Sequence, residues 1–306
     1  MALHQAHEAG HHDHGHAPRS FGFAFAIGTL LNVALVVIQV LYGIHAHSIA
    51  LIADAGHNFG DALGLLLAWG AYVLARWQPT ERYTYGFRAA SILAALLNAA
   101  ILLTTTGAIA WEAIRRFAEP PAVAGATVMV VAGIAVIVNV VAAWLLTGGG
   151  RDLNIRGAFL HAAADAVVSL GVVVAGGVIL LTGWNWVDPI VSLIISAVIV
   201  WGTWGLLRDA VNLSLAAVPA EIEPANVRGY LENLTGVSSV HDLHIWAMST
   251  TETALTCHLV MPHGTPGDEF INQVCDELHR RFGIEHPTVQ IESADQTCRL
   301  APAHVV

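Results

Sequence analysis

Two copies of one histidine–aspartate pair lie inside apolar stretches of the chain: His57 with Asp61, and His161 with Asp165. A spacing of four residues places both side chains on one face of an α-helix, one turn apart. Two such helices packed face to face would direct two imidazoles and two carboxylates to one point, a tetrahedral set that suits Zn2+. These residue types therefore predict a metal site between two helices.

The cost of burying these groups argues against an ordinary packing role. An ionisable side chain at the centre of a bilayer costs roughly 2.5–3.5 kcal/mol. Interhelical hydrogen bonding is the alternative interpretation, and it would suffice for a single intramembrane histidine. Two identical pairs favour a metal ion inside the membrane.

The composition is typical of a membrane protein. The chain has 306 residues, of which 55% are hydrophobic and 12% charged, and its mean hydropathy is +0.60. That is too apolar for a soluble protein of this size. The net charge of −10 argues against nucleic acid as a partner. Cys257, Cys275 and Cys298 form no C-x-x-C pair and favour a reducing compartment over a disulfide framework.

Six apolar stretches are long enough to cross about 30 Å of hydrocarbon, which takes about 20 helical residues. They lie near 21–44, 50–76, 89–114, 123–147, 155–182 and 188–208. In the last of them, Asp188 and Pro189 predict an N-cap followed by the first helical residue.

The arginines set the orientation, because they favour the cytoplasmic side. One side of the predicted membrane holds Arg19, Arg76, Arg82, Arg88, Arg151, Arg156 and Arg208. The other side holds Arg115 and Arg116. With an even number of spans, both termini are then expected in the cytoplasm.

From about residue 220 the pattern changes to that of a small mixed domain. Helices are predicted at 224–234 and 268–282, and strands at 237–248, 253–261 and 287–292. The order αββαβ predicts an α+β domain with helices on one face of a sheet. We therefore expect a His-rich disordered tail (1–20), a six-helix transmembrane domain (21–208), a linker (209–219), the α+β domain (220–296) and a C-terminal tail (297–306).

The α+β domain carries candidate metal ligands of its own. His241 lies in the first predicted strand, His258 in the second and Glu292 in the last. Because alternate residues of a strand share a face, His258 and Glu292 are expected to meet across neighbouring strands, with Cys257 on the opposite face. Cys298 follows in the tail, from which it could reach a site. A purely structural domain is the alternative.

Other polar residues leave two interpretations each. Asp54 is either a fifth ligand or cation attractor, or a helix-start carboxylate favoured by the helix dipole. Asn32, Asn98 and Asn139 either donate to the ligand carboxylates or serve as interhelical hydrogen-bonding groups. The histidine-rich head captures metal or is a dispensable tail; its histidines are His4, His7, His11, His12, His14 and His16.

Three runs of residues resemble one known family. The run from Ser48 to His57, continuing to Asp61, is similar to the second span of cation diffusion facilitators. The run 154–161, continuing to Asp165, is similar to their fifth span, and 240–246 (Val-His-Asp-Leu-His-Ile-Trp) to the first strand of their cytoplasmic domain. The likeness covers residues from about 20 to 295 and is nearest to the zinc-transporter-like branch, bacterial in character.

The resemblance implies a homodimer in the inner membrane, with six helices per protomer and a ferredoxin-like cytoplasmic domain. It implies one intramembrane metal site per protomer, which exchanges metal for protons by alternating access. The transport ligands carry over to His57, Asp61, His161 and Asp165, and the cytoplasmic ligands to His241, His258 and Glu292.

The sequence departs from the family pattern at three places. Arg88-Ala89-Ala90-Ser91 lacks the acidic member of a basic–x–acidic step, and no acidic residue precedes Pro219 within 215–218. Both departures weaken the expectation of a charge lock between the membrane and soluble parts. Gln290 stands where some members have a histidine, which weakens the expectation of a second cytoplasmic metal ion.

The charges of the intramembrane set suggest the activity. Zn2+ with two carboxylates and two neutral imidazoles sums to zero, and protonation of the ligands expels the metal. We therefore expect a proton-coupled Zn2+ antiporter that exports metal from the cytoplasm, with Cd2+, Co2+ or Ni2+ as other candidate ions. The alternatives are an intramembrane metalloenzyme, which needs an open coordination position and a separate base, and a metal sensor without flux.

Overall fold

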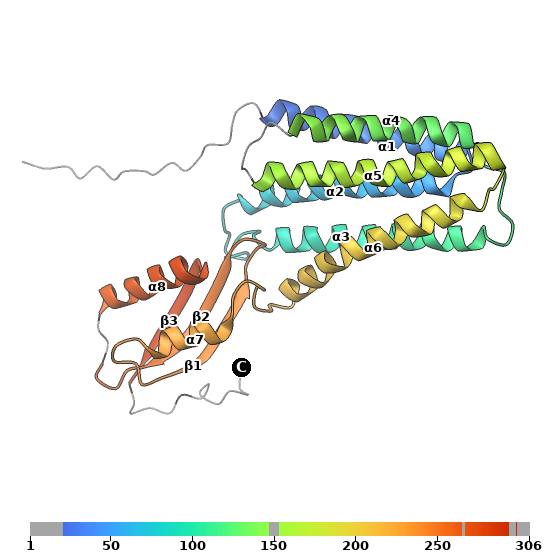
Figure 1. Ribbon diagram of the computed structural model, residues 1–306. Helices are drawn as coiled ribbons and strands as arrows, with labels where there is room; N and C mark the ends of the chain where they lie inside the picture. Colours follow the sequence, from blue (N-terminus) through green and yellow to red (C-terminus); the bar gives the residue numbers. More distant parts are fainter. Residues whose placement is uncertain (1–20, 147–152, 265–266, 294–297, 299–306) are drawn as a thin grey trace, which may run out of the picture.

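The computed structural model describes the backbone of residues 21–146, 153–264, 267–293 and 298, and side chains in these ranges except 21–31, 145–146 and 153–158. A bundle of long helices is followed by a small α+β unit, which lies at one end of the bundle (Figure 1). The predicted histidine-rich head lies outside the described residues.

The predicted spans coincide closely with six helices. These are α1 (Phe21–His45), α2 (Ile49–Ala75), α3 (Ala90–Arg115), α4 (Gly125–Leu146), α5 (Leu153–Thr182) and α6 (Val187–Ser214). Five of them, α2 to α6, are long and apolar enough to cross a membrane. Within the residues whose side chains are described, α1 contributes the shorter apolar segment Asn32–His45.

Helix α6 ends later than its apolar run predicts. It continues past 208 to Ser214, because the end of an apolar run marks the edge of the hydrocarbon and not the end of the helix. The helix ends where Ala216 adopts a left-handed conformation, with φ of 56°. Ala216 N then donates to Leu213 O at 3.1 Å and Ala217 N to Asn212 O at 3.0 Å, the hydrogen bonds of a Schellman motif.

The start of α2 is capped from another helix. Ser48 Oγ accepts from Leu51 N at 3.1 Å, as an N-cap side chain does. Asp188 of α6 accepts from Ile49 N at 2.7 Å and from Ala50 N at 3.3 Å. The prediction that Asp188 caps its own helix is wrong, since α6 begins at Val187 and the carboxylate turns to the free N–H groups of α2.

The α+β unit has the element order that the sequence predicts. It consists of α7 (Pro224–Glu232), β1 (Ser239–Ala247), β2 (Thr253–Val260), α8 (Asp268–Phe282) and β3 (His286–Glu292). The described strands form one sheet in the order β1-β2-β3, in which β1 and β2 are antiparallel and β2 and β3 parallel.

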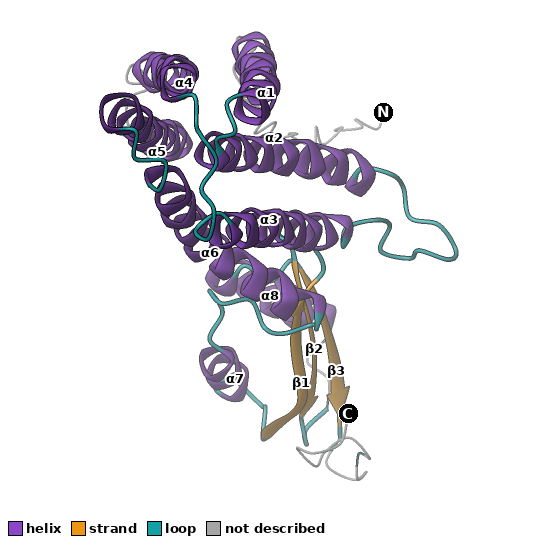
Figure 2. Ribbon diagram, turned by 90° about the vertical axis from the view of Figure 1, so that its right-hand side faces the viewer, coloured by secondary structure: helices purple, strands orange, loops and turns teal. Residues whose placement is uncertain are grey.

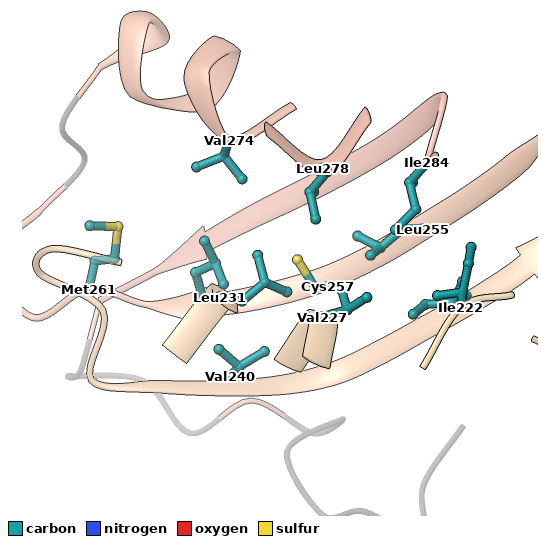
Figure 3. Packing of buried hydrophobic residues seen from close by; sticks show 12 residues of the cluster. Ile222, Val227, Leu231, Val240, Leu255, Cys257, Met261, Val274, Leu278 and Ile284 are labelled. Carbon is teal, nitrogen blue, oxygen red and sulfur yellow. The ribbon is translucent and has the colours of Figure 1, made fainter. Parts of the chain in front are cut away.

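Both helices of this unit cover the same face of the sheet (Figure 2). Leu231 of α7 and Leu278 of α8 meet Leu255, Cys257 and the other inward residues of β2 in one fully buried cluster (Figure 3). Since successive residues of a strand point to opposite faces, the remaining residues of β2 lie on the sheet face that no described helix covers.

The β1–β2 turn joins the α+β unit to the bundle. The Arg88 guanidinium at the start of α3 contacts the Glu252 carboxylate at 2.5 Å. Thr250 N donates to Ser91 Oγ at 3.0 Å. Arg88, which lacks an acidic partner in the sequence around it, therefore pairs with a carboxylate more than 160 positions away. This pair supplies the charged contact between the two parts that the sequence had put in doubt.

Candidate metal centres

The structure brings the two predicted histidine–aspartate pairs together between α2 and α5. His57 Nε2 lies 3.1 Å from Asp165 Oδ1 and 3.9 Å from Asp61 Oδ2. His161 Nε2 lies 3.3 Å from Asp61 Oδ2 and 3.7 Å from Asp165 Oδ2. Each imidazole therefore contacts the aspartate of its own helix and that of the facing helix.

These separations suit a small tetrahedral ion. Metal–ligand distances of about 2.0–2.1 Å place neighbouring ligand atoms of a tetrahedron about 3.4 Å apart. The ligand atoms of His57, Asp61 and Asp165 all lie within 4.8 Å of one another. His161 is not part of this group of three, but its Nε2 contacts both aspartates, and its side chain is 54% accessible whereas that of Asp165 is only 9% accessible.

One carboxylate oxygen of this centre has no proton donor. Asp61 Oδ2 is buried and has no hydrogen-bond partner among the described residues, although it faces the Nε2 atoms of two imidazoles. Buried polar atoms are nearly always paired. A cation held between the four side chains would supply the missing partner, so the donor set fits a divalent metal.

Asp54 is neither a carboxylate of the helix start nor one of the grouped metal ligands. The first turn of α2 holds no acidic residue, and Asp188 supplies the carboxylate at that helix start instead. Asp54 is also no fifth ligand: it is 1% exposed and accepts hydrogen bonds from Gln39 Nε2 at 2.5 Å and from Ser169 Oγ at 3.0 Å. Because Asp54 lies beyond the first turn of α2, the interpretation of Asp54 as a helix-start carboxylate is wrong.

The amides near the centre differ from those that the sequence suggested. Asn98 Oδ1 and Asn139 Nδ2 are buried without a hydrogen-bond partner among the described residues. The amides that join the polar network are Gln39, which donates to Asp54, and Asn58, whose Nδ2 donates to Gln39 Oε1 at 3.1 Å. The position of Asn58 beside His57 in the sequence was the available signal.

A second group of ligands lies on the uncovered face of the sheet. His241 and His258 are paired residues of β1 and β2 and therefore share this face. His241 Nε2 lies 3.2 Å from Glu292 Oε2, and His258 Nδ1 lies 2.9 Å from Glu292 Oε1. The three residues predicted from the strand pattern are thus in mutual contact.

Cys298 joins this second group from beyond β3. Its Sγ lies 3.6 Å from His258 Nδ1, and one ligand atom from each of the four side chains lies within 4.8 Å of the others. His241 Nε2 is buried and has no hydrogen-bond partner among the described residues. The set offers two nitrogens, one oxygen and one sulfur, which suits Zn2+ and softer ions.

The other two cysteines lie away from this centre. Cys257 points into the covered face as predicted, and burial raises the pKa of its thiol to about 12, so it stays protonated at neutral pH. Cys275 lies on α8, and burial also raises the pKa of its thiol. Cys298 is therefore the cysteine that can act as a ligand here.

Sequence reasoning missed Asp242. A β-bulge interrupts the register between His241 and His244, and Asp242 adopts a left-handed conformation there, with φ of 50°. The bulge turns its carboxylate to the ligand face, 3.4 Å from His258 Nε2 and 2.9 Å from His244 Nε2. Aspartate tolerates this conformation better than most residues, and bulges commonly redirect side chains at sites.

Two family descriptions match nearly the whole chain. Residues 25–213 match the cation efflux transmembrane domain, and residues 219–294 match the cytoplasmic domain of cation efflux proteins. The boundary between the two matches falls in the linker between α6 and α7.

Curated relatives match over similar lengths. A cadmium, cobalt and zinc/H(+)-K(+) antiporter of Bacillus velezensis is 32% identical over 92% of each chain. Zinc transporter ZitB of Escherichia coli is 33% identical over 100% of this chain and 96% of that protein. The metal cation efflux system protein CzcD of Cupriavidus metallidurans is 35% identical over 94% of this chain and 90% of that protein.

Proposed function

The chain belongs to the cation diffusion facilitator family of bacterial cation efflux proteins, and from this membership we propose that it is a proton-coupled antiporter that exports Zn2+ from the cytoplasm. The names of the relatives describe an antiporter, a transporter and an efflux protein of metal cations, and the ions they name are zinc, cadmium and cobalt. The choice of Zn2+, the coupling to protons and the ligands are the parts of this proposal that need their own support.

The observation that carries the proposal is the meeting of two identical pairs between α2 and α5. Asp61 and Asp165 each lie between two imidazoles, at distances of 3.1 to 3.9 Å. Two carboxylates balance the charge of one divalent ion, so the loaded site is neutral in a low-dielectric environment. Two nitrogens and two oxygens are a frequent tetrahedral set for Zn2+.

Coupling to protons follows from the same side chains. Metal ligands must be deprotonated, so loading releases protons and protonation displaces the metal. Imidazole is the side chain whose charge changes near physiological pH. In the proposed cycle, metal enters from the cytoplasm and displaces protons from His57 and His161. The site then opens outward, where external protons return to the imidazoles and release the metal.

The arrangement of the arginines supports a cytoplasmic position for the α+β unit. Arg76, Arg82 and Arg88 lie at the end of the bundle that bears this unit, and Arg115 and Arg116 at the opposite end. Since arginine favours the cytoplasmic side, we place the α+β unit and both termini in the cytoplasm. This topology counts α1 as the sixth membrane span in an inner-membrane protein.

The second centre is proposed as a resident metal site of the cytoplasmic, ferredoxin-like domain of a homodimer. His241, His258 and Glu292 would hold the ion, with Cys298 as the fourth ligand and Asp242 orienting His258 from outside. A metal here would link β1, β2 and β3 to Cys298. Such a site suits sensing of cytoplasmic metal, because it lies in the unit that contacts the bundle through Arg88 and Glu252.

The two alternatives to a transporter are less well supported. A metalloenzyme needs an open coordination position and a separate base, whereas four protein side chains surround the bundle centre. A sensor without flux needs only the sheet centre, the group of His241, His258, Glu292 and Cys298 on the uncovered face of the sheet. It gives no reason for paired ligands between α2 and α5.

Flux of Zn2+ into proteoliposomes under an imposed pH gradient tests the proposal. We expect gradient-driven flux by the wild type and none by the double variant Asp61→Ala/Asp165→Ala. Asp209→Ala is the matched control, since Asp209 is an exposed carboxylate at the end of α6. Persistent flux in the double variant would place the pathway elsewhere. Zn2+ binding without gradient-driven flux by the wild type would favour the sensor.

A further inference from the structure

The polar contacts between α2 and α5 continue one turn beyond the bundle metal centre. On α5, Ser169 follows Asp165 by four residues, and on α2, Asp54 precedes His57 by three, so both lie on the facing surfaces. The result is a ladder of three pairs: His161 with Asp61 at 3.3 Å, Asp165 with His57 at 3.1 Å, and Ser169 with Asp54 at 3.0 Å.

The third pair is buried and extends to α1. Asp54 is 1% exposed, and Gln39 and Ser169 are both fully buried. Gln39 Nε2 donates to Asp54 Oδ2 at 2.5 Å, and Ser169 Oγ lies 3.0 Å from both carboxylate oxygens. Asn58 Nδ2 in turn donates a hydrogen bond to Gln39 Oε1 at 3.1 Å. One carboxylate therefore joins three helices.

This pair differs chemically from the two metal-binding pairs. Its donors are a hydroxyl and an amide, which keep their protons throughout the physiological pH range. The imidazoles of the other two pairs gain and lose protons and metal during transport. The contact of Ser169 with Asp54 is therefore the pair of the described α2–α5 ladder whose hydrogen-bond donors neither titrate nor bind metal in the proposed cycle.

Helices α2 and α5 contact each other less extensively than they contact their other neighbours. Helix α5 packs most closely on α4, where a side chain at Gly125 would come within 2.6 Å of Gly176 O. Helix α2 packs mainly on α3 and α1. A buried apolar cluster that includes Leu51 of α2 and Val172 of α5 lies one turn from the Asp54–Ser169 contact. The polar pairs and this cluster therefore set the spacing of α2 and α5 at the metal centre together.

We propose that Asp54, held by Ser169 and Gln39, is a positioning residue for metal transport: it sets the register and separation of α2 and α5 so that the four ligands fit Zn2+. This inference rests on the proposed function. Groups that orient metal ligands from outside typically change metal affinity by about 10–100-fold when they are removed. A looser pair of helices also accepts the larger Cd2+ ion more readily, so the ratio of Zn2+ to Cd2+ transport reports on the spacing.

The test compares Zn2+ and Cd2+ flux in proteoliposomes for Ser169→Ala, Asp54→Asn and the double variant. Ser192→Ala is the matched control, because Ser192 is a buried serine of α6 whose hydroxyl has no hydrogen-bond partner among the described residues. We expect Ser169→Ala to raise the KM for Zn2+ about tenfold or more, with a smaller change in kcat and a lower preference for Zn2+ over Cd2+.

A double-mutant cycle identifies the contact. If Asp54 and Ser169 act through one hydrogen-bonded unit, the double variant changes the KM no more than the worse single variant. The proposal is overturned if Ser169→Ala matches Ser192→Ala in KM and in metal preference, or if the two effects add fully. Should Asp54→Asn fail to fold, Ser169→Ala still tests the proposal, because it removes one hydroxyl only. Absence of flux in the wild type would overturn the transport function itself.

Discussion

Asp188 of α6 accepts a hydrogen bond from the backbone N–H of Ile49 at 2.7 Å, so one helix caps another across the bundle. Asp188 is 1% exposed, and its carboxylate also accepts hydrogen bonds from Ala50 N and from the Ser48 hydroxyl. The contact fixes the start of α2, the helix that carries Asp54, His57 and Asp61.

Removal of this cap should destabilise the bundle. We expect Asp188→Ala to lower the free energy of unfolding by about 1–3 kcal/mol, the usual effect of leaving buried donors without an acceptor. Asp188→Asn keeps one acceptor oxygen and should lose less. Thermal unfolding in detergent, followed by circular dichroism, measures both, with Asp209→Asn as an exposed control on the same helix. Equal stability of Asp188→Ala and the control would contradict the cap.

The contact between Arg88 and Glu252 should hold the α+β unit against the bundle. Both side chains are partly exposed, so the pair itself contributes only about 0.2–1 kcal/mol. We expect Glu252→Arg to increase protease cleavage of the linker at 215–223, and Arg88→Glu/Glu252→Arg to restore protection. Cleavage rates at two salt concentrations measure this, since screening weakens exposed pairs. Failure of the charge swap to restore protection would show that the pair does not hold the units together.

Cys298 should give the sheet centre a thiolate signature. In the Asp61→Ala/Asp165→Ala background, added Co2+ should show sulfur-to-metal charge-transfer absorption that disappears in Cys298→Ser and persists in Cys275→Ser. The reason is that Cys298 Sγ lies 3.6 Å from His258 Nδ1, whereas Cys275 lies on α8, which covers the other face. An unchanged spectrum in Cys298→Ser would remove the sulfur from the ligand set.

Cys257 and Cys298 should also differ in their rates of alkylation. Burial raises the pKa of the Cys257 thiol to about 12 from 9.0, so its reactive thiolate is scarce in the folded protein until the pH approaches 12. At pH 8 we expect iodoacetamide to modify Cys298 and to spare Cys257 unless denaturant is present. Mass spectrometry locates the adducts, and added Zn2+ should protect Cys298. Rapid labelling of Cys257 in the native protein would contradict its place in the core.

Asp242 offers a way to separate backbone strain from ligand orientation. Its φ of 50° costs an ordinary residue roughly 1–2 kcal/mol, and its carboxylate contacts His244 and His258. We expect Asp242→Gly to fold as stably as the wild type but to bind Zn2+ more weakly at the sheet centre. Asp242→Ala should lose both stability and affinity. Calorimetric titration and thermal unfolding distinguish the two, and normal affinity in both variants would contradict an orienting role.

Local patterns in the sequence predicted much of this molecule. Helix α8 begins and ends at the residues expected from its apolar spacing, and the strands of the sheet differ from their predicted ranges by one or two residues. The four side chains of the bundle centre could be grouped because a spacing of four residues fixes a helix face. Contacts between segments that are distant in the sequence could not be predicted from these local patterns.

Three such contacts explain the errors and omissions. Asp188 looked like a cap for its own helix, but free N–H groups of α2 lie nearer to its carboxylate. Glu252 became the partner of Arg88 only because the β1–β2 turn folds back against α3. Asp242 reached the ligand face through a bulge, which breaks the alternation on which strand predictions depend.

Strand β2 places Cys257 in the apolar core and His258 in the metal set on consecutive residues. A slip of β2 by one position would exchange the two faces of the strand. Such a slip would place the His258 imidazole among the leucines of the core and would remove it from the metal-ligand group. The same one-residue slip therefore costs both core packing and metal binding, so a bound ion would favour the correct pairing of β2 with its neighbours while the domain folds.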